Sequence, residues 1–146
     1  MMEMSSLLYQ LKVTEQHITN LFEKQLQISL TRYELLQSLL EQSPCSQIAL
    51  QERLKIDQAA ITRHLRVLED RGYVTRQRNP HNQREMLVEL TQKARTELVE
   101  SPPMHHQAVK EQMATILTEE ESEHLHQLLD KIQTGLEAIR IDTKEK

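Results

Sequence analysis

The stretch from Ser46 to Thr91 constrains the fold more than any other part of the chain. Two short amphipathic helices come first, Gly72 follows, and two segments with strand-like alternation then flank a polar turn at residues 79–82. Ser46 and Asp57 are residue types that cap helix N-termini, and glycine is the residue that most readily ends a helix in the left-handed conformation. This order of elements predicts a winged helix-turn-helix.

The charge of this stretch is opposite in sign to that of the rest of the chain. Residues 53–84 hold eight Lys and Arg against three Asp and Glu, which gives a net charge of +5. The whole chain carries −4, so the remaining residues sum to −9. A basic segment within an acidic chain predicts one face that binds a polyanion, and we expect that polyanion to be double-stranded DNA.

The remaining composition limits the class of protein. The 146 residues suffice for one domain with an oligomerisation element, and the few glycines, prolines and aromatics favour a mainly α fold with a small β-hairpin wing. A single cysteine fits a reducing cytoplasm, no apolar run is long enough to span a membrane, and the N-terminus lacks the pattern of a signal peptide. The sequence contains no glycine-rich phosphate loop, nucleophile elbow or zinc-hydrolase motif, so we expect neither enzymatic activity nor a cofactor.

The helices on either side of this stretch carry apolar stripes that one small module cannot cover. We therefore expect residues 1–30 and 92–146 to form a helical dimerisation region and residues 31–91 to form the DNA-binding module. The product would be a homodimer that presents two modules to a palindromic site. A helical bundle within a monomer is the alternative, and the tail 142–146 is expected to fray in either case.

Several helix ends can be predicted from capping residues. Thr31 and Thr118 each open a sequence with the spacing of a capping box. The Ser-Pro-Pro sequence at 101–103 predicts a break, with Ser101 as the cap of a restarted helix and Pro102 as its first residue. The restarted helix is expected to run through Leu117, and the last helix through Ile139. Inward-facing residues of the helix after Ser46 are expected to be Ile48, Leu50 and Leu54.

The DNA-binding residues are predicted from residue type and position. Arginine pairs with guanine and glutamine with adenine in the major groove, so the exposed first half of the helix after Asp57 is expected to read bases or hold phosphates. Helix N-termini bind phosphates through backbone amides, and an arginine in the wing can enter the minor groove. The predicted contacts are Ser46, Gln47, Gln58, Ala59, Thr62, Arg63, Arg66, Arg76 and Arg78 (the last two on phosphates), and Arg84 in the minor groove.

Several segments match one known family in order along nearly the whole chain. They are Leu30-Thr31, Ala60-Ile61-Thr62-Arg63, Leu68-Glu69-Asp70-Arg71-Gly72-Tyr73-Val74, Leu90-Thr91 and Leu117-Thr118-Glu119-Glu120-Glu121. With these segments the chain resembles the MarR family of transcriptional regulators. The resemblance implies a sequence-specific regulator, in most members a repressor, that binds a palindromic operator as a dimer and is released by a small ligand. Asn82 departs from the family's wing, which usually has an acid at this position before the arginine.

The resemblance also implies a small-ligand pocket between the dimerisation helices and the DNA-binding module. His17, Tyr33 and Met104 are the candidate lining residues. Metal- or redox-responsive regulation is one alternative, but Cys45 has no cation beside it in the sequence. Neighbouring histidines on a helix point to different sides, so no metal site is predicted. A winged-helix adaptor that binds protein rather than DNA is a further alternative, which the basic segment disfavours.

Overall fold

The computed structural model describes residues 2–141, so the predicted fraying of residues 142–146 lies outside the described residues. The chain divides into two compact units, Met1–His106 and Gln107–Lys146, and each is described here by itself. None of the described helices is long and apolar enough to cross a membrane.

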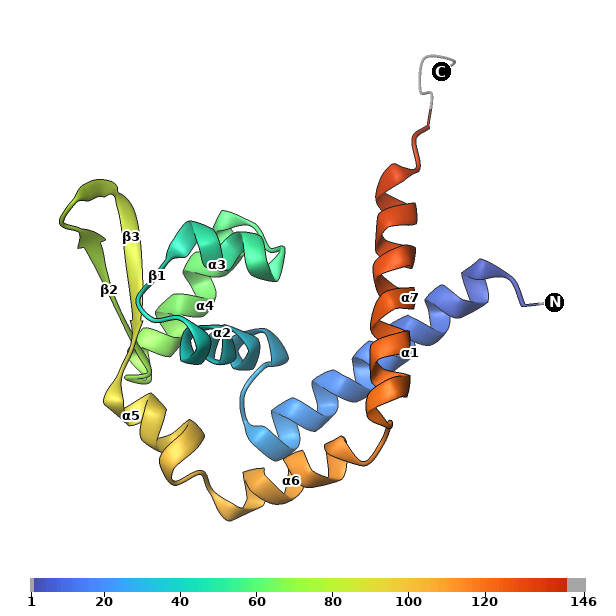
Figure 1. Cartoon of the computed structure of the whole chain (residues 1–146), viewed down its shortest axis with the longest axis horizontal. Coiled ribbons are helices and arrows are strands. Elements are labelled where there is room, and N and C mark those ends of the chain that lie inside the picture. Colours follow the sequence, from blue (N-terminus) through green and yellow to red (C-terminus); the bar gives the residue numbers. More distant parts are fainter. Residues whose placement is uncertain (1, 142–146) are drawn as a thin grey trace. The chain divides into compact units, whose positions relative to one another are not determined.

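The first unit contains helices, two short π-helical segments and three strands (Figure 1). Its elements are α1 (Met4–Leu21), the π-helical segment η1 (Phe22–Leu26), α2 (Leu30–Glu41), β1 (Cys45–Ser46), α3 (Gln47–Leu54), α4 (Gln58–Asp70), β2 (Val74–Asn79), β3 (Asn82–Leu90), α5 (Gln92–Arg95) and the π-helical segment η2 (Thr96–Glu100). The helix α6 (Met104–Ala114) begins in this unit, and α7 (Glu119–Ala138) lies in the second. We refer to the part from α2 to β3 as the winged module.

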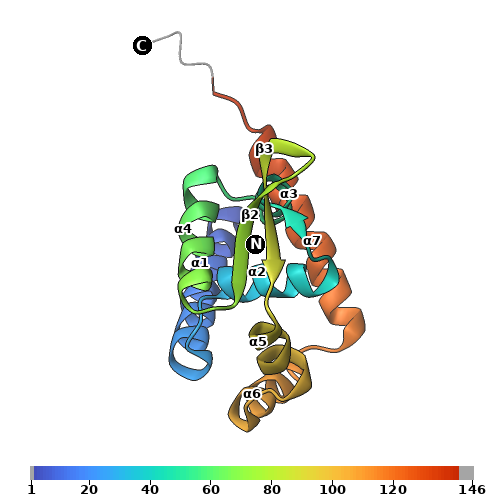
Figure 2. The same cartoon turned by 90° about the vertical axis from the view of Figure 1, so that its left-hand side faces the viewer.

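The predicted hairpin is confirmed, and it belongs to a larger sheet than the sequence indicated. Three antiparallel strands lie in the order β1-β3-β2, so that Val88 of β3 pairs with Cys45 on one side and with Arg76 on the other. The strand β3 starts at Asn82, the last residue of the turn expected at residues 79–82. The tip of the hairpin points away from α5 in both views (Figures 1 and 2). The short strand β1 was not predicted, because two residues are too few to show an alternating pattern.

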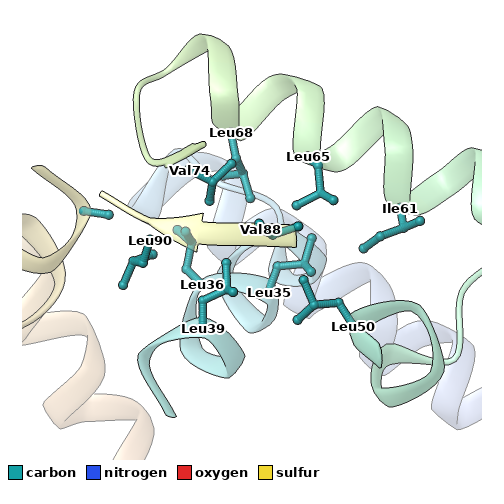
Figure 3. Packing of buried hydrophobic residues seen from close by; sticks show 11 residues of the cluster. Leu35, Leu36, Leu39, Leu50, Ile61, Leu65, Leu68, Val74, Val88 and Leu90 are labelled. Carbon is teal, nitrogen blue, oxygen red and sulfur yellow. The ribbon is translucent and has the colours of Figure 1, made fainter. Parts of the chain in front are cut away.

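Side chains from α2, α3, α4, the sheet and α5 fill one hydrophobic core (Figure 3). From α4, Ile61, Leu65 and Leu68 point toward Val88 of β3, as their spacing predicts. The prediction for Ile48 is wrong, because 59% of its surface is exposed and Leu50 is the side chain of α3 that fills the core. The core therefore fixes α4 by one face and leaves its opposite face free.

Capping residues define the ends of several helices. The hydroxyls of Ser46, Thr91 and Thr118 and the carboxylate of Asp57 accept from amides in the first turn of their helices, and Thr118 forms the predicted capping box. The capping box predicted at Thr31 is wrong. The cap of α2 lies two residues earlier, at Ser29, whose Oγ accepts from the amide of Arg32 at 3.2 Å, and the helix starts at Leu30.

Gly72 ends α4 in the left-handed conformation, as the sequence predicts, with φ of +78°. The amide of Tyr73 donates to the carbonyl of Leu68 and that of Gly72 donates to the carbonyl of Glu69, which is the Schellman arrangement. A side chain at residue 72 would be strained at this φ. The turn directs the chain from the end of α4 into β2.

The break at Ser101-Pro102-Pro103 is confirmed, but the prediction that Pro102 starts the next helix is wrong. The helix α6 starts at Met104. Pro103 disfavours the helical conformation for the residue before it, so Pro102 cannot open the helix. The structure also corrects two helix ends, because α6 stops at Ala114 instead of continuing to Leu117, and Ile139 follows the last residue of α7.

Candidate nucleic-acid interface

The exposed face of α4 brings five of the predicted DNA contacts together. Gln58, Ala59, Thr62, Arg63 and Arg66 line one open hollow of about 480 Å³. They share a face because the core holds the opposite side of the helix through residues at a helical spacing. Two arginines, an amide and a hydroxyl on one helix face are the groups that read base edges in a major groove.

The helix α3 contributes to this face through one side chain. The Nε2 of Gln47 donates to the Oγ1 of Thr62 at 3.2 Å, which links the first turn of α3 to the middle of α4. The hydroxyl of Thr62 accepts this bond, so its own proton remains available for an outside acceptor. Ser46 caps α3 by accepting from the amide of Ala49 at 3.0 Å. The structure thus gives Ser46 and Gln47 roles within the module, and their phosphate contacts stay predictions.

Hydrogen bonds from side chains to the backbone hold the loop of the wing. The Oδ1 of Asn82 accepts from the backbone amide of Arg84 at 3.2 Å, and the Oδ1 of Asn79 accepts from the amide of His81 at 3.0 Å. Arg78 donates through Nη1 to the carbonyl of Gln83 at 3.2 Å. The asparagine at the usual acid position therefore positions the backbone of Arg84, whose side chain is exposed.

Arg76 is positioned differently from the other arginines of the wing. Its Nη2 lies 3.0 Å from the Oε1 of Glu69, and only 18% of its side chain is exposed. The ion pair joins β2 to α4 and adds a polar contact to the hydrophobic packing between them. Its predicted phosphate contact is untested.

Sequence reasoning missed a polar network at the base of the wing. The Oη of Tyr73 donates to the Oε2 of Glu97 at 2.6 Å, and the Nζ of Lys93 lies 5.2 Å from the centre of the Tyr73 ring. Lys93 also donates to the carbonyl of Arg71 at 2.8 Å. Burial, and then the Glu97 carboxylate, raise the pKa of Tyr73 to about 12. The partners are far apart in sequence, and no local pattern indicates them.

The three predicted ligand-binding residues are differently placed. His17 is exposed on α1, and 86% of the surface of Met104 is exposed. Tyr33 is half-buried and packs edge-on against Phe22, with ring centroids 5.6 Å apart. The site predicted from them stays a prediction.

A second hollow, of about 410 Å³, lies inside the winged module between α2 and α3. It is lined by Leu30, Thr31, Glu34, Ser38, Arg53, Leu54 and Ile56. Ser38 is 2% exposed, and its hydroxyl has no hydrogen-bond partner within residues 2–141. Arg53 closes one side of the hollow and pairs with Glu41.

Cys45 and the histidines were the sensor candidates. Cys45 lies in β1, and burial raises the pKa of its thiol, which reduces the fraction of reactive thiolate. Nearby Arg53 opposes that shift, and its effect is the smaller one. Within the part of the chain that the structure describes, no group of three or more His, Cys, Asp and Glu is placed to hold a metal ion.

Comparisons with known proteins agree with this geometry. A model of the MarR family matches residues 28–86. The HTH-type transcriptional regulator YdgJ of Bacillus subtilis (strain 168), described as uncharacterized, is 39% identical over 118 residues, which cover 81% of this chain and 72% of that protein.

Two solved structures extend the comparison to three dimensions. A probable transcriptional regulator from Pseudomonas aeruginosa is 28% identical with a TM-score of 0.71, and the match covers 85% of this chain and 94% of that chain. A cysteine-to-serine mutant of MarR from E. coli, complexed with operator DNA, is 25% identical with a TM-score of 0.68, and covers 88% and 91% of the two chains. The chain belongs to the MarR family of DNA-binding transcriptional regulators, with the winged-helix fold of that family.

Proposed function

We propose that this regulator is a repressor that binds a palindromic operator as a homodimer. The observation that carries the proposal is the hollow on α4, where Gln58, Thr62, Arg63 and Arg66 face outward together. These side chains suit base edges and phosphates, and the exposed Arg84 at the wing suits a narrow minor groove. The E. coli MarR mutant with a similar fold was solved with operator DNA, which supports DNA as the partner.

Exposed apolar side chains on the terminal helices support the dimer. Leu125, Leu128 and Leu136 of α7 are 43–45% exposed, and none of the side chains described for α7 is buried. Met4 and Tyr9 of α1 are more than half exposed. An apolar stripe of this kind favours burial against a second copy. The division into dimerisation helices (1–30 and 92–146) and a DNA-binding module (31–91) is part of this proposal.

Selection of bound sequences from a pool of random DNA tests the proposal. Two winged modules related by a two-fold axis should select two inverted half-sites whose centres lie about 10 base pairs, or a multiple of that spacing, apart. A single half-site would contradict the homodimer, and the absence of any selected sequence would contradict sequence-specific binding. A reporter gene with the selected site beside its promoter then tests repression, since expression should rise when the regulator gene is deleted.

Release by a small molecule is the second part of the proposal. The hollow between α2 and α3 supports it, because it has apolar side chains and the Ser38 hydroxyl, which makes no hydrogen bond among residues 2–141. These groups offer a small amphiphile both burial and a hydrogen bond. Small aromatic acids and amines can be screened for loss of operator binding. A Ser38→Val variant, which removes the hydroxyl from the lining of this hollow, should weaken the response while it keeps operator affinity, whereas an unchanged response would place the effector elsewhere.

A further inference from the structure

Arg32 has surroundings that are unusual for an arginine. It lies in the first turn of α2, outside the helix-turn-helix formed by α3 and α4. Its Nε atom is buried and makes no hydrogen bond within the described residues. A buried donor without an acceptor has lost its hydration and gained nothing in exchange. The DNA-free protein therefore leaves this guanidinium with an unused hydrogen bond.

The charges around Arg32 are of its own sign. Burial lowers the pKa of Arg32 first, and the neighbouring guanidinium groups of Arg71 and Arg63 lower it further. The first turn of a helix also carries the positive end of the helix dipole, where a cation is unfavourable. Each of these effects would be relieved by an anion placed among the three arginines.

His64 of α4 completes the group. Its Nδ1 is buried without a hydrogen-bond partner among residues 2–141. Burial lowers the pKa of His64 first, and Arg32 and Arg63 lower it further. The neutral form of the imidazole is therefore favoured beside the arginines, and an approaching anion would raise the pKa of His64 so that it could take up a proton from solvent. We call Arg32, Arg63, His64 and Arg71 the Arg32 cluster.

The Arg32 cluster adjoins the face of α4 that faces DNA in the proposed function. Arg63 belongs both to this cluster and to the hollow on α4. In the same cluster, Arg71 uses Nη1 to donate to the carbonyl of Gln27 at 3.2 Å. A guanidinium has five N–H donors, so Arg71 is held in place and keeps donors for another acceptor. The cluster thus extends the basic surface of α4 onto α2.

We propose that the Arg32 cluster is a phosphate site that holds the backbone of bound DNA beside the base-reading face of α4. The guanidinium forks supply paired donors that match phosphate oxygens, and His64 adds a further donor when it takes up a proton. Because a backbone phosphate is common to all sequences, the site contributes affinity and register without sequence preference. This inference rests on DNA binding through α4.

The salt dependence of DNA binding tests the site through two matched variants. Arg32→Gln removes one positive charge from the cluster, and glutamine is also compatible with a helix. Arg53→Gln removes one positive charge from the same module at a position paired with Glu41. Affinity is measured at several KCl concentrations for the selected operator and for a 30-base-pair duplex of arbitrary sequence, together with the Tm of each DNA-free protein.

Arg32→Gln should weaken binding to both duplexes about equally, by about five- to tenfold near 0.1 M KCl, and reduce the salt slope by about 0.9. Its DNA-free Tm should equal or exceed that of the wild type, because the substitution removes one of the like charges that repel one another. Arg53→Gln should leave the slope unchanged. In the wild type, nuclear magnetic resonance should show that the pKa of His64 rises when the arbitrary duplex binds.

Four results would overturn the site. They are an unchanged slope in Arg32→Gln, a loss of affinity for the operator alone, a loss accompanied by a lower Tm, and an equal loss in Arg53→Gln. If inorganic phosphate at constant ionic strength raised the Tm only when Arg32 is present, while the DNA slope stayed unchanged, the site would serve free phosphate instead. A wild-type protein without affinity for either duplex overturns DNA binding itself, whereas normal wild-type binding with an unaffected variant overturns the Arg32 cluster alone.

Discussion

The winged module and the helix α7 use the same apolar residue types with different results. In the winged module, Leu35, Leu39 and Leu65 are fully buried in a core that this module forms together with Ala94 of α5. In α7, Leu125 and Leu128 remain 43% exposed although they lie at a helical spacing. The comparison indicates that the leucines of the winged module are buried within one hydrophobic core of the chain, whereas α7 presents a surface that the proposed second copy would cover.

Truncation of a core leucine should have the largest effect and should separate the two regions. Leu65→Ala leaves a cavity in a fully buried site and should lower the free energy of unfolding by about 2–5 kcal/mol. Leu128→Ala, at protein concentrations where the chain is monomeric, should lower it by less than about 1 kcal/mol, because the side chain is already partly hydrated. Urea denaturation measures the free energy of unfolding of both variants. Equal losses of stability would contradict the difference in burial between the winged module and α7.

A charge on α7 should act on association rather than on folding. Leu128→Glu should weaken the dimer at least about tenfold, which corresponds to about 1.4 kcal/mol, because a carboxylate loses its hydration in an apolar interface. Sedimentation at graded concentrations measures the dissociation constant. Gln127→Glu, on the same helix, adds the same charge at an exposed polar position and serves as the control. Equal dimer affinities for wild type and Leu128→Glu would place the interface elsewhere.

Replacement of a wing arginine should weaken DNA binding without changing the stability of the winged module or of α7. Arg84→Ala should weaken operator binding about tenfold, or about 1.4 kcal/mol, because it removes an exposed guanidinium from the wing. Asn82→Ala should have a smaller effect, since Asn82 supports Arg84 only through the backbone amide. Gel-shift titration at fixed salt measures both variants. Unchanged affinity in Arg84→Ala would exclude the minor-groove role.

Helix caps should behave alike in the two regions, because a cap needs only its own helix. Asp57 caps α4 through the amide of Ala60, and Thr118 caps α7 through the amide of Glu121. Replacement of either cap by alanine should cost about 1 kcal/mol. Amide hydrogen exchange at Ala60 and Glu121 should show the loss of protection. A much larger cost at Thr118 would mean that this residue also contributes to tertiary packing.

The smallest expected effect is a pH dependence that arises from the winged module. His64 has a lowered pKa in the folded protein, so the unfolded chain binds more protons as pH falls through the ordinary histidine range near 6.5. The DNA-free protein should therefore lose stability between about pH 7.5 and 5.5. His64→Gln should reduce this loss, as measured by Tm at the two pH values. An identical loss in the variant would assign the dependence to other groups.

Local sequence patterns predicted the helices that form the candidate nucleic-acid interface. The caps at Ser46 and Asp57, the end of α4 at Gly72 and the buried stripe of α4 depend on residues within one or two turns of each other, so the sequence shows them directly. The exposed face of α4 followed from that stripe. The structure therefore places five of the predicted residues on one face of α4, and their contact with DNA stays a prediction.

The remaining features depend on contacts between distant segments. The pairing of β1 with β3, the bond from Tyr73 to Glu97 and the charges around Arg32 join residues that no local pattern relates. The error at Thr31 is different in kind, because two hydroxyl residues compete for the cap and Ser29 comes first in the chain. Capping preference alone does not decide between them.

The most direct test of the account is to repeat the selection of bound DNA with a Gln58→Ala variant. Gln58 is the first residue of α4 and lines the hollow that supports the proposed DNA binding. If two copies of α4 read the operator, the variant should still select inverted half-sites with the same spacing, but should lose the preference at one base position in each half-site symmetrically. A selected motif identical to that of the wild type, or a change confined to one half-site, would contradict the central claim.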